Sequence, residues 1–220
     1  MTPSSAETET LQIISSCGAL LLEDHFVYAS GDHGSGWIAK DLVSIRPALT
    51  MRLGALLAQA CADLEPAPEL VCGPAIGGLL CGHATAFAME LPFVYAEHHP
   101  GESTPTFELR RGFGEVVAGR EVLVVDDVVN TGFSIGLVIR AVRKAGGRVG
   151  TAATWVDRGN VDAAGLGVDR FIRLVEIDLP SWPESDCPLC AQRVPINTRY
   201  AHGAEYLEAH SSGDAHEVVD

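Results

Sequence analysis

Hydrophobic residues recur along the chain with two different spacings, which predict alternating helices and strands. Leu11, Ile14, Cys17 and Leu21 follow one another at helical spacing, and the leucines between positions 49 and 57 do so again. Short continuous apolar runs, such as LVC and VLVV, are typical of strands buried on both faces of a parallel sheet. The pattern therefore predicts an α/β fold with a mostly parallel central sheet flanked by helices.

The expected elements follow from these patterns and from the turn-forming residues between them. Helices are expected over 11–21, 49–60, 77–91 and 134–147, and strands over 25–29, 69–72, 92–97, 121–127, 148–156 and 169–178. A loop rich in glycine and serine is expected over 30–36. Residues 204–220 contain several acids and no Lys or Arg, which predicts an unstructured tail.

Composition narrows the class of protein. Of the 220 residues, 47% are hydrophobic and 20% are charged, which is enough apolar material for a folded core. The 29 acidic residues outnumber the 15 basic ones, and the net charge of −14 argues against nucleic acid or an anionic membrane as a partner. The sequence shows neither a signal pattern nor a run of 18 apolar residues, so we expect a cytoplasmic protein with unpaired cysteines.

The clearest chemical signal is the segment EVLVVDDVVNTGFS at residues 121–134. An apolar strand is expected to end in Asp126 and Asp127, at the edge of the sheet where α/β proteins place their ligands. A loop over 128–131 and Gly132 follow, and Ser134 is expected to cap the next helix. Backbone N–H groups at a helix start can bind phosphate, and paired carboxylates can bind a sugar diol. The segment therefore predicts a site for a sugar phosphate.

This order of apolar residues, acid pair and Thr-Gly turn resembles the phosphoribosyl pyrophosphate (PRPP) signature of type I phosphoribosyltransferases. The segments HFVYASGDHGSGWIAKDLVSIRP, LVCGPAIGGLLCG and WVDRG are similar to the orotate phosphoribosyltransferases within that family. The resemblance implies transfer of the phosphoribosyl group of PRPP to orotate in a homodimer, with Mg²⁺ bound through PRPP and no direct protein ligand assigned to it. It also implies one domain over 1–203, with a core over about 46–177 and a small hood from about 10–45 and 178–202.

The resemblance also implies the site residues. PRPP contacts are expected from Asp126, Asp127, Val128, Val129, Asn130, Thr131, Gly132, Phe133 and Ser134, and from Gly73, Gly77 and Gly78 in the loop that receives pyrophosphate. The two acids are the expected catalytic residues, close to the ribose carbon on which positive charge develops. Orotate contacts are expected from Arg158, Thr131 and Lys40, since a guanidinium group pairs well with a carboxylate.

One segment departs from the family pattern. The family's mobile loop usually supplies lysine and histidine to the pyrophosphate, whereas EHHPGESTPTFELRRGF contains no lysine. Its cationic candidates are His98, His99, Arg110 and Arg111, and solvated residues on a hairpin are an equally good interpretation of the two histidines.

Several alternatives remain open. The run from Gly132 to Gly136 matches the G-x-S-x-G elbow of serine hydrolases, with Ser134 as nucleophile and Asp178 and His202 as later triad members. A phosphoribosyltransferase for another base, or a regulator that binds PRPP without turnover, would carry the same motif. Cys187 and Cys190, followed by His202 and His210, approach the spacing of a zinc site, and the other interpretation is a turn packed on the core.

Overall fold

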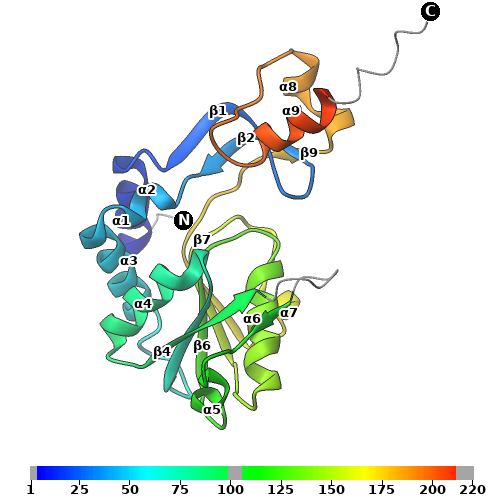
Figure 1. The fold of residues 1–220 in the computed structure, drawn as a ribbon. Coiled ribbons are helices and arrows are strands. Elements are labelled where there is room, and N and C mark those ends of the chain that lie inside the picture. Colours follow the sequence, from blue (N-terminus) through cyan, green and yellow to red (C-terminus); the bar gives the residue numbers. More distant parts are fainter. Residues whose placement is uncertain (1–3, 99–105, 212–220) are drawn as a thin grey trace, which may run out of the picture. The chain divides into compact units, whose positions relative to one another are not determined.

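The computed structural model describes residues 4–98 and 106–211 and divides the chain into two compact units (Figure 1). The sheet unit comprises Lys40–Asp178 with the described residues up to Ile14. The hairpin unit comprises Ser15–Ala39 with the described residues from Leu179 onward. This unit thus joins two parts of the chain that are far apart in the sequence.

The sheet unit contains a six-stranded sheet in the order β5-β4-β3-β6-β7-β8. Its strands are β3 (Leu70–Pro74), β4 (Phe93–His98), β5 (Phe107–Glu108), β6 (Val122–Val129), β7 (Thr151–Asp157) and β8 (Arg170–Glu176). Neighbouring strands are parallel except for β4 and β5, which pair antiparallel. The predicted α/β class with a mostly parallel sheet is confirmed.

The continuous apolar runs form the central strands because both faces of the sheet are covered. In β6 the residues from Val122 to Val125 are each at most 1% exposed, and in β3 Leu70, Val71 and Cys72 are completely buried. Each Å² of apolar surface removed from water contributes about 25 cal/mol. The centre of the sheet is therefore stabilised by many small contributions rather than by a particular contact.

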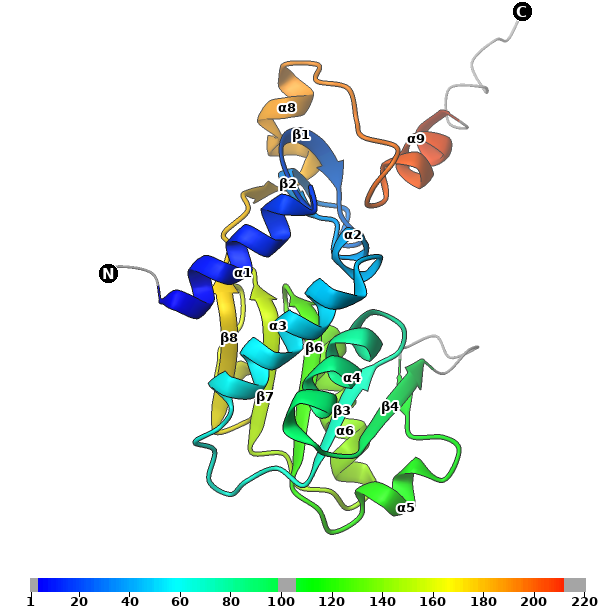
Figure 2. The same cartoon turned by 90° about the vertical axis from the view of Figure 1, so that its left-hand side faces the viewer.

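Helices cover the sheet on its two faces. Helices α3 (Pro47–Ala60) and α4 (Gly77–Met89) lie on one face, and α6 (Phe133–Lys144) lies on the other (Figure 2). Helix α6 buries Ile135, Val138, Ile139 and Val142, which recur at the spacing of one helix face. The other helices are α1 (Ser5–Ser16), α2 (Asp41–Ser44), α5 (Phe113–Val117) and α7 (Ala163–Leu166).

The hairpin unit contains a three-stranded antiparallel sheet in the order β1-β2-β9. Strands β1 (Leu20–Val27) and β2 (His33–Ile38) form the hairpin, and β9 (Ser181–Trp182) pairs with the start of β2. The chain continues through a 3₁₀ turn, η1 (Glu184–Asp186), and two helices, α8 (Pro188–Ala191) and α9 (Gly203–Ser211).

Three predictions for this part of the chain are wrong. Helix α1 ends at Ser16, since Gly18 turns the backbone with φ of 65°, and Leu21 therefore lies in β1. The glycines expected in a loop over 30–36 lie partly in β2, where the Tyr28 hydroxyl donates to the Gly36 carbonyl at 2.7 Å. The first part of the expected unstructured tail belongs to helix α9, in which the Tyr206 hydroxyl donates a hydrogen bond to the Glu184 carboxylate. Residues 212–220 lie outside the described residues.

Among the helices that the structure describes, none has the length and apolar character needed to span a membrane.

Candidate active site

The acid pair lies inside strand β6 rather than after it. We expected the strand to end at Asp127, but β6 continues to Val129, so the loop before α6 is only Asn130–Gly132. The strand extends further because Val128 and Val129 pair with Val156 and Asp157 of the parallel strand β7. Both acids are buried, with 6% and 4% of their surface exposed.

The position of the acid pair in the sheet is the one at which α/β proteins bind ligands. Strands β3 and β6 are neighbours, but the chain passes from β3 to β4 on one side and from β6 to β7 on the other. Crevices form at the carboxyl ends of strands where the strand order reverses in this way. The glycine-rich turn after β3 and the acid pair of β6 therefore meet at one edge of the sheet.

Two glycines of that turn approach the acid pair closely. A Cβ atom added to Gly78 would lie 2.9 Å from an Asp126 carboxylate oxygen, and one added to Gly77 would lie 2.5 Å from Lys40 Nζ and 3.5 Å from Asp127 Oδ2. Any side chain at these two positions would clash with the charged groups. The structure thus brings the predicted pyrophosphate loop and the predicted acid pair together.

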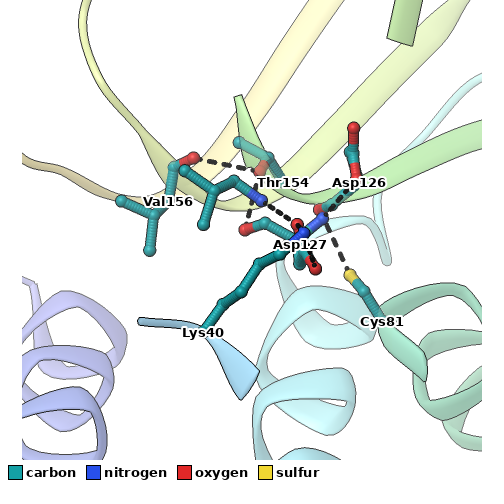
Figure 3. A network of polar contacts seen from close by, with 7 residues as sticks. Lys40, Cys81, Asp126, Asp127, Thr154 and Val156 are labelled. Atoms are coloured by element: carbon teal, nitrogen blue, oxygen red, sulfur yellow. Dashed lines mark hydrogen bonds and ion pairs between the residues drawn. The ribbon is translucent and has the colours of Figure 1, made fainter. Parts of the chain in front are cut away.

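Lys40 binds the second acid. Its Nζ lies 2.9 Å and 2.8 Å from the two carboxylate oxygens of Asp127 (Figure 3). Burial opposes the charge on the ammonium group, but the attraction of Asp127 and, more weakly, Asp126 outweighs it, and the pKa of Lys40 is raised. Lys40 is therefore a charged member of the site.

Asp126 has the opposite environment. Burial raises the pKa of its carboxyl group well above the ordinary value, and repulsion by the Asp127 carboxylate raises it further, while Lys40 acts in the other direction. One of its oxygens accepts a hydrogen bond from the Asp127 backbone N–H at 2.9 Å. Asp126 thus holds a negative charge less readily than an ordinary carboxyl group does.

Two polar residues of this network were not predicted from the sequence. Thr154 of β7 donates to the Asp127 carbonyl at 3.2 Å, and the Cys81 thiol of α4 donates to the Asp126 carbonyl at 3.2 Å (Figure 3). Thr154 pairs with Asp126 across the β6–β7 ladder, a register that the sequence pattern does not reveal. Burial raises the pKa of the Cys81 thiol, which therefore stays neutral.

The loop after β6 leads directly into α6. Gly132, with φ of 74°, takes the position before the helix, and α6 begins at Phe133. Ser134 is therefore not the cap that the sequence suggested: it lies in the first turn, and no side chain caps this helix. The first N–H groups of a helix have no partner within it, so this helix start is suited to an anion.

Arg158 follows strand β7 at the same edge of the sheet. Its backbone N–H donates to the Val129 carbonyl at 2.8 Å, and the residue is only 6% exposed. The neighbouring Asp157 carboxylate lies 3.4 Å from Arg173 and accepts from the Gly159 N–H at 2.9 Å. Burial raises the pKa of Asp157, although the Gly159 N–H and Arg173 oppose the shift. Arg158 is therefore a buried residue at this edge of the sheet.

An open pocket adjoins this residue. It has a volume of about 500 Å³ and is lined by Asp157, Gly159, Asn160, Val161, Asp162, Gly165, Arg173 and Glu176. The Asn160 side chain also donates to Asn130 Oδ1 at 2.7 Å, which connects the loop after β7 with the loop after β6. The polar lining is suited to a polar rather than an aliphatic ligand.

The lysine-free segment begins in β4, contains β5 and ends at the start of α5. Its described cationic residues are His98 on β4, whose ring packs against Phe107, and two arginines after β5. Arg110 pairs with Glu108 at 3.3 Å, and Arg111 pairs with Glu97 at 3.1 Å. His99 lies outside the described residues.

Comparison with known proteins identifies the class of protein to which this chain belongs. The model of the phosphoribosyl transferase domain matches residues 42–183. Orotate phosphoribosyltransferase from Phenylobacterium zucineum (strain HLK1) is 36% identical over 178 residues, covering 80% of this chain and 87% of that protein. A solved orotate phosphoribosyltransferase from Aeropyrum pernix is 28% identical with a TM-score of 0.59, covering 76% of this chain and 92% of that one. The chain belongs to the phosphoribosyltransferases and, within them, to the orotate phosphoribosyltransferase family.

Similarity of fold alone does not show which nucleobase a phosphoribosyltransferase uses. An adenine phosphoribosyltransferase from Thermoanaerobacter pseudethanolicus has a TM-score of 0.60 at 20% identity, covering 76% of this chain and 99% of that one. The base must therefore be selected by particular side chains rather than by the architecture.

The serine hydrolase alternative is wrong. A nucleophile elbow places its serine on the sharp turn between strand and helix. Here the turn is Asn130–Gly132, and Ser134 already belongs to helix α6. The family assignment, which rests on most of the chain, agrees with this geometry.

Proposed function

We propose that this protein transfers the phosphoribosyl group of PRPP to N1 of orotate and releases pyrophosphate, giving orotidine 5′-monophosphate. The observation that carries the proposal is the meeting of the acid pair of β6 with the glycine turn after β3 at the point where the strand order reverses. The membership in the orotate phosphoribosyltransferase family supports the choice of base.

The reaction demands charge stabilisation rather than covalent catalysis. As the bond from ribose C1 to the pyrophosphate oxygen breaks, positive charge grows on the ribose ring and negative charge on pyrophosphate. N1 of orotate then bonds to C1. A site that binds both developing charges better than the substrate accelerates this step. In this proposal the backbone N–H groups near Gly77 and Gly78 bind the pyrophosphate, and the start of α6 near Thr131, Gly132 and Ser134 binds the 5′-phosphate.

The acid pair has two tasks in this proposal. Carboxylate oxygens accept hydrogen bonds from the ribose hydroxyls, which fixes the ring. They also lie beside the carbon on which positive charge develops. Because Asp126 resists ionisation in the unliganded protein, a developing cation next to it would favour its charged form. Lys40, bound to Asp127, is placed to exchange this contact for one with an anionic substrate.

Arg158 is the proposed contact of the orotate carboxylate, together with Thr131 and Lys40. Orotate differs from uracil by this carboxylate, which a guanidinium group can bind through two charged hydrogen bonds. A site built for that pairing rejects a base that lacks it far more strongly than a pocket can reject a missing methylene. Arg158 is the residue on which the discrimination between bases depends in this proposal.

Magnesium fits the site as a partner of PRPP. Around the acid pair the described residues offer no group of three or more metal-ligating side chains, and Asp127 is bound to Lys40. Mg²⁺ commonly keeps several waters and binds through substrate phosphates with one or two carboxylates. Bound in this way, it supplies charge neutralisation for the departing pyrophosphate, and Asp126 and Asp127 are the carboxylates that would lie nearest.

A homodimer is the proposed assembly. Helix α4 leaves the large apolar side chains of Leu80 and Phe87 exposed, and residues seven apart lie on one helix face. Sedimentation of the purified protein tests the assembly, and a monomer at micromolar concentration would contradict it.

Turnover with a panel of bases tests the activity. With PRPP and Mg²⁺ the protein should consume orotate, and it should not use uracil, adenine or hypoxanthine at a comparable rate. Arg158→Ala should raise the KM for orotate far more than the KM for PRPP, whereas Arg140→Ala, an exposed residue on α6, should change neither. Conversion of another base would overturn the assignment of orotate, and PRPP binding without turnover would indicate a regulator.

A further inference from the structure

Four side chains with metal-ligating atoms gather in the hairpin unit, and none of them is among the residues proposed for catalysis. They are His25, His33, Cys187 and Cys190, and their ligand atoms all lie within 4.8 Å of one another. Among the residues that the structure describes, this is the one such group. The sequence indicated Cys187 and Cys190 but paired them with His202 and His210, which do not belong to the group.

The distances within the group are close to those of a metal site. Cys187 Sγ lies 3.6 Å from His25 Nε2, and Cys190 Sγ lies 3.7 Å from His25 Nε2 and 3.3 Å from His33 Nδ1. A tetrahedral zinc ion, with bonds of about 2.3 Å to sulfur and about 2.0 Å to nitrogen, separates its ligands by roughly 3.3–3.8 Å. The two imidazole nitrogens are closer, at 2.8 Å, so they need to move apart by about 0.5 Å around such an ion.

The hairpin explains why two histidines eight residues apart face the same point. His33 pairs with Val27 across the β1–β2 ladder, so the two residues share one face of the hairpin. His25 precedes Val27 by two residues, and its Nε2 lies 2.8 Å from His33 Nδ1, so the two imidazole rings face the same point. The signal was absent from the spacing of the sequence because it depends on this register.

The orientation of His25 is the one that metal-binding histidines adopt. Its Nδ1 donates to the Val194 carbonyl at 2.8 Å, so the neutral ring presents an unprotonated Nε2 to the two sulfur atoms. Histidine ligands nearly always donate their second ring N–H in this manner, which fixes both ring and tautomer. The His33 ring is in turn packed edge-to-face against Tyr206.

The surroundings favour a closed structural site. His25, His33 and Cys187 are buried, with 1%, 0% and 3% of their surface exposed. The chain from Pro180 to His210 has only two buried residues, Cys187 and Gly203, and so offers little apolar core of its own. Small units of this kind commonly rely on a metal or a disulfide.

We propose that His25, His33, Cys187 and Cys190 bind one zinc ion, which connects the β1–β2 hairpin to the segment that carries η1 and α8. Two sulfur and two nitrogen ligands in a buried tetrahedron are typical of structural zinc, and they leave no position for substrate. The two thiols bind as thiolates and release their protons to solvent. The site is independent of the proposed reaction, so a zinc-free protein that still consumes orotate would overturn this inference and leave the proposed function intact.

Elemental analysis of the untagged full-length protein, expressed with zinc in the medium and desalted under reducing conditions, tests the proposal. We expect about one zinc ion per chain. The Cys187→Ser/Cys190→Ser variant should retain less than a tenth of that amount. Cys61→Ala, which removes a buried cysteine of the sheet unit, should retain all of it.

Cobalt substitution gives a readout that does not depend on any variant. Exchange of the wild-type protein into Co²⁺ should produce the intense visible bands of tetrahedral cobalt and the near-ultraviolet bands of thiolate-to-cobalt charge transfer. This spectrum decides the question if the double variant does not fold. Less than a tenth of an equivalent of zinc together with no cobalt bands would overturn the proposal, as would a Cys187–Cys190 disulfide in the freshly purified protein. Bound iron or copper in place of zinc would overturn the choice of metal.

Discussion

The sheet unit and the hairpin unit are stabilised in different ways. In the sheet unit, β3, β6 and α6 contribute a continuous apolar interior in which Leu70, Leu123 and Val138 are almost completely buried. In the hairpin unit, the segment after β9 is connected to β1 mainly through polar contacts. Asn197 donates to the His25 carbonyl at 2.7 Å and its side chain to Asp24 at 2.6 Å. A continuous apolar interior thus dominates the sheet unit, whereas polar contacts connect the segment after β9 to β1 in the hairpin unit.

This difference has a consequence for mutations. Each apolar residue of a packed core contributes its own part, so the sheet unit tolerates the change of a polar residue at its edge. In the hairpin unit the buried polar side chains of His25 and His33 contact each other. A buried polar group that loses its partner lowers the stability of the folded state. Activity and stability should therefore respond to different residues.

The largest expected effect comes from removing the proposed zinc ion. A chelator, or Cys187→Ser/Cys190→Ser, should destabilise the hairpin unit by about 4 kcal/mol when free zinc is about 1,000 times the Kd. Hydrogen exchange read by mass spectrometry should show faster exchange in peptides of β1, β2 and α8. Peptides of β3 and β6 should be unchanged, and Cys61→Ala should leave the hairpin peptides unaffected. Equal acceleration in all peptides would contradict the difference between the units.

The two units also differed in how well the sequence predicted them. The strands of the sheet unit are continuous apolar runs, and their burial on two faces is a local property that a pattern of residues records. The acid pair and the glycine turn could be assigned because each is a short motif that directly follows an apolar run in the sequence. In the hairpin unit the decisive contacts join positions more than 150 residues apart, such as His25 and Val194. Neither periodicity nor motif spacing contains that information.

Within the site, no pattern in the sequence predicted which side chains contact each other. That Lys40 binds Asp127, 87 residues away, follows from the fold rather than from a local pattern. The same is true of Thr154, whose hydroxyl donates to the Asp127 carbonyl through the pairing of β6 with β7. The expected cap at Ser134 was wrong because Gly132 already turns the backbone before α6.

The second prediction concerns the acid pair of the sheet unit. Replacing Asp126 and Asp127 together with Asn should lower kcat/KM for PRPP and orotate by at least about 100-fold, or about 2.7 kcal/mol, since charge-assisted hydrogen bonds become neutral ones. The melting temperature should change far less, because the apolar interior remains. Asp169→Asn, at the opposite end of the sheet before β8, is the matched control and should retain full activity. Wild-type turnover by the double variant would contradict the role of the pair.

The third prediction uses the pH dependence of stability. Because the folded-state pKa of Asp126 is raised above its ordinary value of 3.8, the folded protein holds a proton that the unfolded chain releases. Its contribution to stability is therefore complete below about pH 3.8 and is lost as the pH rises through the raised pKa, by up to about 1.4 kcal/mol per pH unit. Asp126→Asn lacks this loss. From pH 4 upward, urea unfolding should show that the free energy of unfolding of the variant increases relative to that of the wild type. A difference that does not change with pH would contradict the raised pKa.

The smallest expected effect compares one polar contact from each unit. The Tyr206 hydroxyl of α9 donates to Glu184, and burial, reinforced by this carboxylate, raises the pKa of Tyr206 to about 12. Tyr206→Phe should lower the stability of the hairpin unit by about 1 kcal/mol, visible as faster exchange around η1 and α9. Arg111→Ala removes an exposed pair with Glu97 in the sheet unit, and water screens that pair so well that exchange in β4 should not change. If both variants accelerated exchange equally, polar contacts would contribute equally to the stability of the two units. The proposed greater dependence of the hairpin unit on polar contacts would then be wrong.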